Sequence, residues 1–170
     1  MNKTLYLLRH AKAESWNPLG NDFSRALAPK GTAHARAVAD WFNERVTPPD
    51  TVLCSPAKRT RETLAPILDL WPSLLSTTDY IDSIYGASTH MLNTITGDAF
   101  SYSDSLLMVG HNPGFEDLLL SSIKPEQGSK INKMATGTLA IIEFPDGFRG
   151  DAQVGNLLHL IRRKDLNVSD

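Results

Sequence analysis

The segment TLYLLRH, residues 4–10, decides the fold of this chain, because an apolar run ends there in an arginine and a histidine. Residues 4–8 have the continuous apolar character of a strand that is buried in a parallel sheet. In an open α/β sheet, binding sites form outside the carboxyl ends of the strands. We therefore expect Arg9 and His10 to lie at a functional edge of a sheet.

Two further strands of the same kind follow along the chain, and a pair of late strands comes after them. The runs TVLC (51–54) and SLLMV (105–109) are predicted as buried strands. The runs TLAIIEF (138–144) and NLLHLI (156–161) flank a turn and are expected to pair antiparallel. Helical patterns separate the first three strands. We therefore expect a three-layer α/β fold, with a mostly parallel central sheet and helices on both of its faces.

The helices are predicted from apolar periodicity and from capping residues. They cover about 32–46, 55–70 and 88–97, and a fourth follows Asn112 and Pro113. Ser55 and Pro56 have the form of an N-cap followed by a proline at the first helical position. Ser88 is expected to cap the third helix, which is predicted to stop before Gly97. The stretch 124–137 is polar and is expected to be a loop.

Composition limits the classes of function. The chain has 170 residues, 41% of them hydrophobic, which suits one domain over residues 1–170. Its net charge of −2 gives no general attraction to nucleic acid or to an anionic membrane. No apolar run approaches the length of a membrane span, and the N-terminus has no signal-peptide pattern. A single cysteine excludes an internal disulfide, so a cytoplasmic location is expected.

Three predicted strand ends deliver polar residues to one edge of the sheet. These residues are Arg9 and His10, then Ser55 with Arg59 one helical turn later, then Gly110 and His111. Arginine forks match phosphate oxygens and stay charged, and helix N-termini add N–H groups that favour anions. A neutral imidazole can attack phosphorus and carry the phosphoryl group, while a protonated one would add a donor to its oxygens. The pattern predicts a phosphoryl-transfer site.

Each of these residues has an ordinary structural interpretation when it is taken alone, and their joint placement favours the functional one. His34 and His90 fall on predicted helices, and His159 falls inside a late strand. No strand end supports these three histidines, so they are interpreted as structural. Cys54 is interpreted as a buried strand residue.

Three motifs resemble the histidine phosphatase superfamily, also called phosphoglycerate mutase-like, and the match spans nearly the whole chain. They are LLRHAKAE (7–14), SPAKRTRET (55–63) and VGHNPGFEDLL (109–119). The short length, RHAKA (9–13), DFSRALAPKG (22–31) and MATGTLAIIEF (134–144) look most similar to the bacterial phosphohistidine phosphatase branch. Many superfamily members have glycine where this chain has Ala11, but members of that branch also have alanine. The mutases carry substrate-covering insertions for which this chain has no room, so mutase activity is not expected.

The resemblance implies a role for each matching residue. His10 is the nucleophile that becomes phosphorylated, and Arg9, Arg59 and His111 form the phosphate pocket around it. No metal or other cofactor is implied. The implied substrate is phosphohistidine in a partner protein, with a small phosphomonoester as the alternative. Asp22 and Arg25 match a recurrent pattern of the branch, which places Arg25 near the pocket mouth.

The proton donor is the least defined part of the predicted site. DSIYG (82–86) resembles the superfamily stretch in which a glutamate stands four residues before a glycine and acts as the general acid. Asp82 occupies that place with a side chain shorter by one methylene. Glu116 is a second candidate, although an acid in the first turn of a helix is commonly there because the helix dipole stabilises it. Phosphohistidine needs such an acid less, because its imidazole can be protonated before the P–N bond breaks.

Three other functions are compatible with parts of the pattern. A metallohydrolase would use His10, His111 and Asp22 as ligands, but the neighbouring arginines would repel the cation. A cysteine phosphatase would use Cys54 and Arg59, but four residues separate them where that family has five, and no glycine-rich loop lies between. A non-catalytic module that binds phosphorylated protein would keep the arginines and have no need of the nucleophile.

Overall fold

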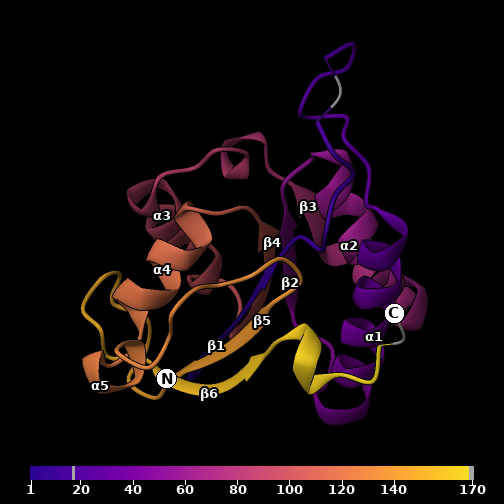
Figure 1. Cartoon of the computed structure of the whole chain (residues 1–170). Coiled ribbons are helices and arrows are strands. Elements are labelled where there is room, and N and C mark those ends of the chain that lie inside the picture. The colour runs from indigo at the N-terminus through magenta and orange to yellow at the C-terminus, as the bar shows by residue number, and fades with distance from the viewer. Residues whose placement is uncertain (17, 169–170) are drawn as a thin grey trace.

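Within residues 1–16 and 18–168, which the computed structural model describes, six strands form one sheet (Figure 1). In their order across the sheet they are β3 (Thr78–Tyr80), β2 (Thr51–Cys54), β4 (Ser105–Gly110), β1 (Lys3–Arg9), β5 (Leu139–Phe144) and β6 (Asn156–Ile161). The first four run parallel, and β5 runs antiparallel to both of its neighbours. The expected antiparallel pairing of the two late strands is confirmed.

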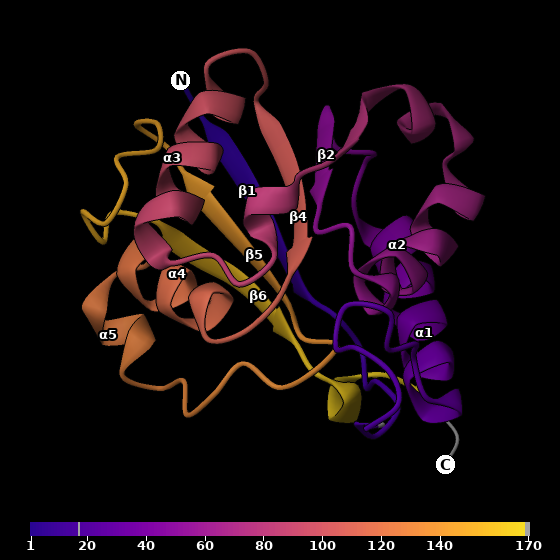
Figure 2. The same ribbon diagram turned by 90° about the horizontal axis from the view of Figure 1, so that it is seen from above.

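Helices cover both faces of the sheet, as the view from above shows (Figure 2). One face carries α1 (Pro29–Arg45) and α2 (Lys58–Leu70); the other carries α3 (Thr89–Phe100) and α4 (Gly114–Ser122), which is followed by α5 (Pro125–Gly128). The 3₁₀ turns are η1 (Pro72–Thr77), η2 (Asp82–Ile84) and η3 (Arg163–Asp165). This arrangement confirms the expected three-layer α/β fold.

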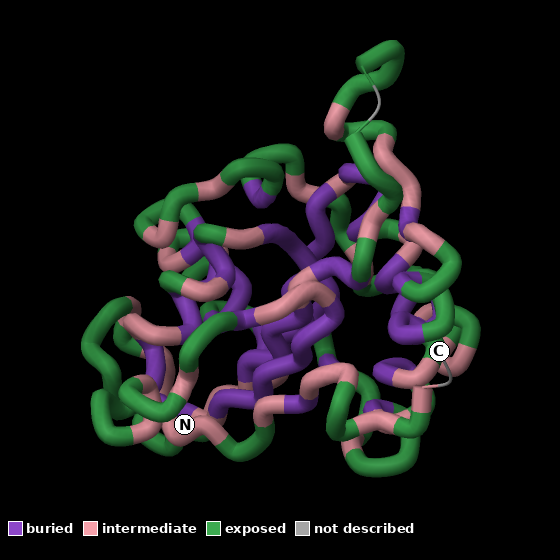
Figure 3. Tube along the Cα trace, viewed as in Figure 1, coloured by how far each residue is buried: buried purple, intermediate pink, exposed green. Residues whose placement is uncertain are grey.

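The core consists of two layers because successive strand residues point to opposite faces of the sheet. On β1, Leu5 and Leu7 pack in the same apolar cluster as Phe115 of α4. Tyr6 and Leu8 pack on the opposite face with Phe42 of α1. Figure 3 shows the sheet as the buried centre of the molecule. Burial on both faces explains why the central strands read as continuous apolar runs.

Two predicted helix boundaries are wrong. Ser55 does not cap α2; Ala57 stands at its N-cap, and the helix begins at Lys58. The cause is tertiary, because the Ser55 hydroxyl pairs with His111 and the N–H of Lys58 donates to the carbonyl of Phe23. The third predicted helix continues past its glycine to Phe100, because that residue is buried against the core.

Two short elements escaped prediction. The helix α5 forms at the start of 124–137, which was expected to be a loop throughout. The edge strand β3 has three residues, which is too short for an apolar alternation to be visible.

Pro66 lies inside α2, and the helix continues through it to Leu70. Among the described residues, no helix combines the length and the apolar character that crossing a membrane requires.

A long connection between β1 and α1 rises above the carboxyl edge of the sheet (Figure 1). We call residues 11–16 and 18–28 the arm. Its two sides are joined by an antiparallel bridge between Ala13 and Leu27, and the N–H of Glu14 donates to Ala26 at 2.8 Å. The arm is mostly exposed (Figure 3), including the side chain of Trp16.

Candidate active site

The three strand ends that the sequence singles out are neighbours, because β4 lies between β1 and β2. Arg9 pairs with Gly110 across the β1–β4 ladder. Just beyond the strands, the N–H of His10 donates to the carbonyl of Gly110 at 3.0 Å, and that of Ser55 donates to Val109 at 3.0 Å. The polar residues that follow the three strands therefore lie at one edge of the sheet.

His10 is buried at this edge and faces His111, with the two ring centroids 5.2 Å apart. Its Nδ1 lies 2.7 Å from the carbonyl oxygen of Ala11. A carbonyl oxygen only accepts hydrogen bonds, so Nδ1 carries the proton in this contact. The neutral ring then presents an unprotonated Nε2, which is the form that a nucleophilic imidazole needs.

The surroundings of His10 keep its ring neutral. Burial lowers the pKa of His10 to about 4, and the positive charges of Arg59, Arg9 and Arg25 also lower it. The hydrogen bond to Ala11 acts in the opposite direction and raises the pKa. A ring with this pKa is neutral at pH 7. The nucleophilic form of His10 therefore needs no separate base to remove a proton.

Arg59 stands in the first turn of α2, and its side chain is only 6% exposed. Its Nη1 donates to the main-chain oxygen of Asp22 at 2.7 Å, and its Nη2 donates to Oδ2 of the same residue at 2.9 Å. Arg61 is exposed instead, and its guanidinium lies over the ring of Tyr80 at 4.3 Å. The helix thus turns one arginine toward the strand ends and the other to solvent.

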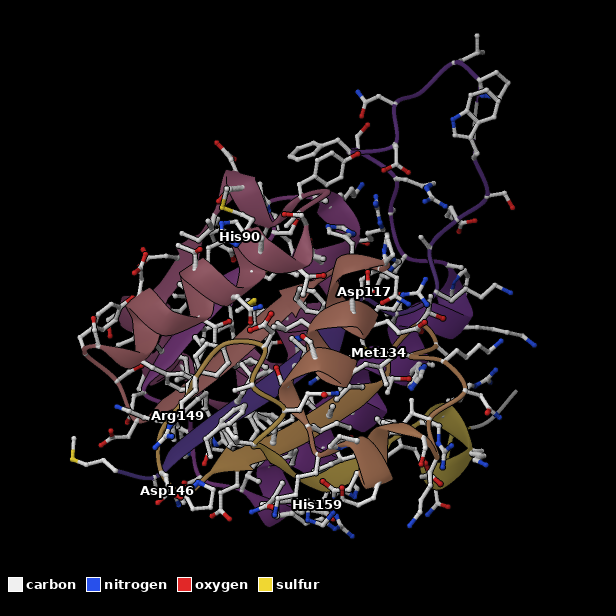
Figure 4. The ribbon with its side chains drawn as sticks, turned by 90° about the vertical axis from the view of Figure 1, so that its left-hand side faces the viewer. His90, Asp117, Met134, Asp146, Arg149 and His159 are labelled. Carbon is white, nitrogen blue, oxygen red and sulfur yellow. The ribbon has the colours of Figure 1, made fainter. Side chains whose placement is uncertain are left out.

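Arg9 is held by the loop that contains Met134, which Figure 4 labels. Nη1 of Arg9 donates to the carbonyl of Met134 at 2.8 Å, and Nδ2 of Asn112 donates to the same oxygen at 2.9 Å. The N–H of Met134 donates to Oε2 of Glu116 at 2.5 Å. Burial lowers the pKa of Arg9, and the nearby Glu116 charge opposes this shift. Glu116 therefore clamps this loop.

His111 follows β4, and its Nε2 lies 2.7 Å from the hydroxyl of Ser55. Burial lowers the pKa of His111 to about 3, with the charges of Arg59 and His10 acting in the same direction. His111 is therefore neutral at pH 7 in this structure. These surroundings do not favour the protonated second histidine that the sequence had suggested as a donor. Its Nδ1 is buried and has no partner among the described residues.

Arg25 is a third arginine of the site, which the sequence analysis placed only near the pocket mouth. Its Nη2 donates to Oδ1 of Asp22 at 2.9 Å, and its Nη1 donates to the carbonyl of Glu14 at 3.0 Å. Its charge acts on His10. The signal in the sequence was the three-residue spacing from Asp22 to Arg25, which the base of the arm uses for an ion pair.

Several donors of the cluster are buried without a partner among the described residues. They are the Nε atoms of Arg9, Arg25 and Arg59, together with Nδ1 of His111. Buried polar atoms are normally satisfied, because each unpaired one costs free energy. An oxyanion with several acceptor oxygens satisfies multiple donors at once, so the arrangement fits a phosphoryl group.

The other candidate residues lie in different environments. Asp82 is exposed on η2, and its carboxylate makes no hydrogen bond or ion pair with any described residue. His34 is buried in α1, whereas His90 on α3 and His159 on β6 are exposed. Cys54 is buried on β2, and burial raises the pKa of its thiol to about 12. A thiol in that state is a poor nucleophile.

A metal centre has no donor set in the described ranges 1–16 and 18–168, where no group of three His, Cys, Asp or Glu side chains is placed to hold an ion. The carboxylate of Asp22, which a metallohydrolase would use, is bonded to Arg25 and Arg59.

Comparison with known proteins identifies the family of the chain. The family model described as the histidine phosphatase superfamily, branch 1, matches residues 5–84. A Mycobacterium leprae protein is 30% identical over 122 residues, which cover 67% of this chain and 70% of that protein. The chain belongs to the histidine phosphatase superfamily. A Mycobacterium tuberculosis protein is 31% identical over 106 residues, and the match covers 62% of this chain and 63% of that relative's length.

Within the superfamily, the chain is similar to a protein of Agrobacterium tumefaciens assigned as the phosphohistidine phosphatase SixA. The two structures superimpose with a TM-score of 0.82 at 29% sequence identity, over 94% of this chain and 97% of that one. The resemblance to the phosphohistidine phosphatase branch is thereby confirmed at the level of sequence and fold.

Proposed function

We propose that this protein is a metal-independent phosphatase that works through a phosphohistidine at His10 and acts on phosphohistidine in a partner protein. The observation that carries the proposal is the state of His10. Its Nδ1 proton is engaged by Ala11, so Nε2 is free to attack, and three arginine charges act on the ring. These are the parts that phosphoryl transfer requires: a nucleophile and fixed positive charge for the oxygens.

In the first step, the lone pair of His10 Nε2 forms a bond to phosphorus while the bond to the leaving group breaks. The leaving group takes the electron pair of that bond, and the imidazole of a phosphohistidine substrate has already taken a proton from solvent. Arg9, Arg25 and Arg59 neutralise the phosphoryl oxygens, and a neutral His111 protonated at Nδ1 donates one further hydrogen bond. The Ser55 hydroxyl favours this tautomer when it donates to Nε2 of His111.

In the second step, water attacks the phosphorus of phosphorylated His10. The P–N bond breaks, its electron pair returns to Nε2, and the water releases a proton to solvent as inorganic phosphate forms. The bond from Nδ1 to Ala11 holds the ring in one orientation through both steps. This fixed orientation keeps the reacting atoms in line, which is the main requirement of phosphoryl transfer.

Two observations favour phosphohistidine as the substrate over a small phosphomonoester. Asp82, the expected acid, is exposed and unbonded, whereas an imidazole leaving group can be protonated before its P–N bond breaks. The arm carries exposed apolar side chains, with Trp16 at 66% and Phe23 at 42% exposure, which suit contact with a protein surface. The similarity to the Agrobacterium protein assigned as SixA supports the same substrate class.

A turnover panel tests the proposal. Wild type and His10→Ala are compared on phosphohistidine protein, an aryl phosphate and several sugar phosphates, with and without a chelator. We expect wild type to release phosphate most efficiently from phosphohistidine, without metal, and His10→Ala to be inactive. A labelled enzyme intermediate should be acid-labile, base-stable and located on the peptide that contains His10. Label on another peptide would remove His10 from its role.

The same panel separates the alternatives. Preference for a sugar phosphate would indicate a small-molecule phosphomonoesterase, and phosphate binding without turnover of any substrate would indicate a phosphoprotein-binding module. Asp82→Asn should reduce turnover of alkyl phosphates most, aryl phosphates less and phosphohistidine least, if Asp82 is the acid. An equal loss on all three would show a structural role, and no loss would exclude Asp82 from the mechanism.

A further inference from the structure

The side chain of Asp22 connects three donors of the candidate site from the base of the arm. Its Oδ2 accepts from Nη2 of Arg59 at 2.9 Å and from the hydroxyl of Tyr85 at 2.7 Å. Its Oδ1 accepts from Nη2 of Arg25 at 2.9 Å. One carboxylate thus holds groups that come from the arm, from α2 and from the segment after η2.

Asp22 determines how Arg59 is presented. Both terminal nitrogens of the guanidinium are bonded to this one residue, through its main-chain oxygen and Oδ2. Two bonds from a planar fork to one partner fix the plane of the guanidinium. Nε of Arg59 is a further donor, which is buried and has no partner among the described residues. Arg59 is therefore oriented before any phosphoryl group arrives.

Tyr85 extends the same network to the second histidine. Its hydroxyl donates to Asp22, and its ring packs edge-on against His111 at 5.4 Å and against Phe23 of the arm at 5.3 Å. The Arg59 guanidinium lies 5.9 Å from the centre of the same ring. Asp22 therefore links the arm both to Arg59 and to Tyr85.

We propose that Asp22 is a positioning residue that orients Arg59 and Arg25 for the transition state while its negative charge restrains the binding of ground-state phosphate. The proposal rests on the proposed phosphatase function and deepens it. A group whose geometry matters in the transition state changes kcat, whereas a uniform loss of phosphate binding changes KM. The two effects of Asp22 on phosphate binding oppose each other, because its carboxylate both orders the arginines and repels an anion.

The test uses Asp22→Asn, which keeps the shape of the side chain and removes its charge. We measure kcat on an aryl phosphate, and we measure by calorimetry the dissociation constants of inorganic phosphate and of vanadate, which adopts the five-coordinate geometry of the transition state. A misplaced arginine should lower kcat and weaken vanadate binding by about tenfold or more. Phosphate binding should change by less than about threefold, because lost ordering and lost repulsion offset each other.

Asp98→Asn is the matched control, because it makes the same substitution and removes one negative charge at an exposed position on α3, outside the candidate site. It should leave kcat and both dissociation constants unchanged. Tyr85→Phe removes one of the two donors to Oδ2 and should move the vanadate constant in the same direction by a smaller factor.

Two results would overturn the proposal. The first is that Asp22→Asn behaves like the Asp98→Asn control, and the second is that it weakens phosphate and vanadate binding by the same factor and also lowers the melting temperature. The second result would mean that Asp22 only maintains the fold of the arm. The ratio of the two dissociation constants can be measured without turnover, so it decides the role of Asp22 independently of activity. A wild type that hydrolyses no substrate would refute the phosphatase function separately.

Discussion

Replacement of Arg59 and of Arg61 by alanine should have very different effects, although the two residues are nearly adjacent on α2. The Arg59 side chain is 6% exposed and bonded twice to Asp22, and its charge acts on both His10 and His111. Two residues further along a helix correspond to a rotation of about 200°. Arg61 accordingly faces solvent, where its guanidinium lies over Tyr80.

The magnitudes follow from these environments. Arg59→Ala removes a buried, charged donor from the proposed phosphate pocket, which should cost about 2–4 kcal/mol of transition-state stabilisation, or about 30- to 1000-fold in kcat/KM. Arg61→Ala removes an exposed cation–π contact, which is worth about 0.5–1 kcal/mol of folding stability. It should leave kcat/KM within about twofold, because no transition-state contact is lost.

Steady-state kinetics on an aryl phosphate and on phosphohistidine protein, with thermal melting of each variant, provide the measurement. Arg59→Lys adds a useful comparison, because lysine keeps the charge but cannot form the planar fork. It should recover only part of the activity. Equal and small effects of Arg59→Ala and Arg61→Ala in folded proteins would refute the placement of Arg59 beside the reacting group.

Three further outcomes are expected. The folded-state pKa values of about 4 for His10 and about 3 for His111 lie below the ordinary value of 6.5, so the unfolded chain binds more protons than the folded one as the pH falls. The free energy of unfolding should therefore be highest above about pH 6.5 and decline toward pH 4. Melting temperatures in phosphate-free buffer will show this decline. Gly137→Ala should lower both the melting temperature and turnover, because Gly137 has a φ of 73° and a β-carbon there would meet the ring of His34; unchanged values would show that the turn adapts. Cys54→Ser should retain turnover within about twofold, since the buried thiol lies outside the proposed chemistry, and abolished turnover in a folded variant would revive a cysteine mechanism.

The sequence alone predicts the strands of the sheet and the residues that follow them. Apolar runs such as TVLC (51–54) and SLLMV (105–109) mark β2 and β4 because burial on both faces selects apolar residues at every position. Arg9, His10 and His111 could be predicted at one edge because the carboxyl ends of parallel strands meet there. These inferences need only local patterns and one rule of topology.

Tertiary packing alone decides how these residues are held. Ser55 has the sequence signature of a helix cap, yet its hydroxyl pairs with His111, which arrives from a distant strand end. Asp22 reaches Arg59 across 37 positions of the chain, and Arg9 reaches Met134 across 125. No local periodicity encodes such pairs, because the arm and the loop after α5 take their places only when the sheet and its helices have brought their ends together. The identity of the proposed site residues is therefore local information, whereas their protonation and orientation depend on contacts between segments far apart in the chain.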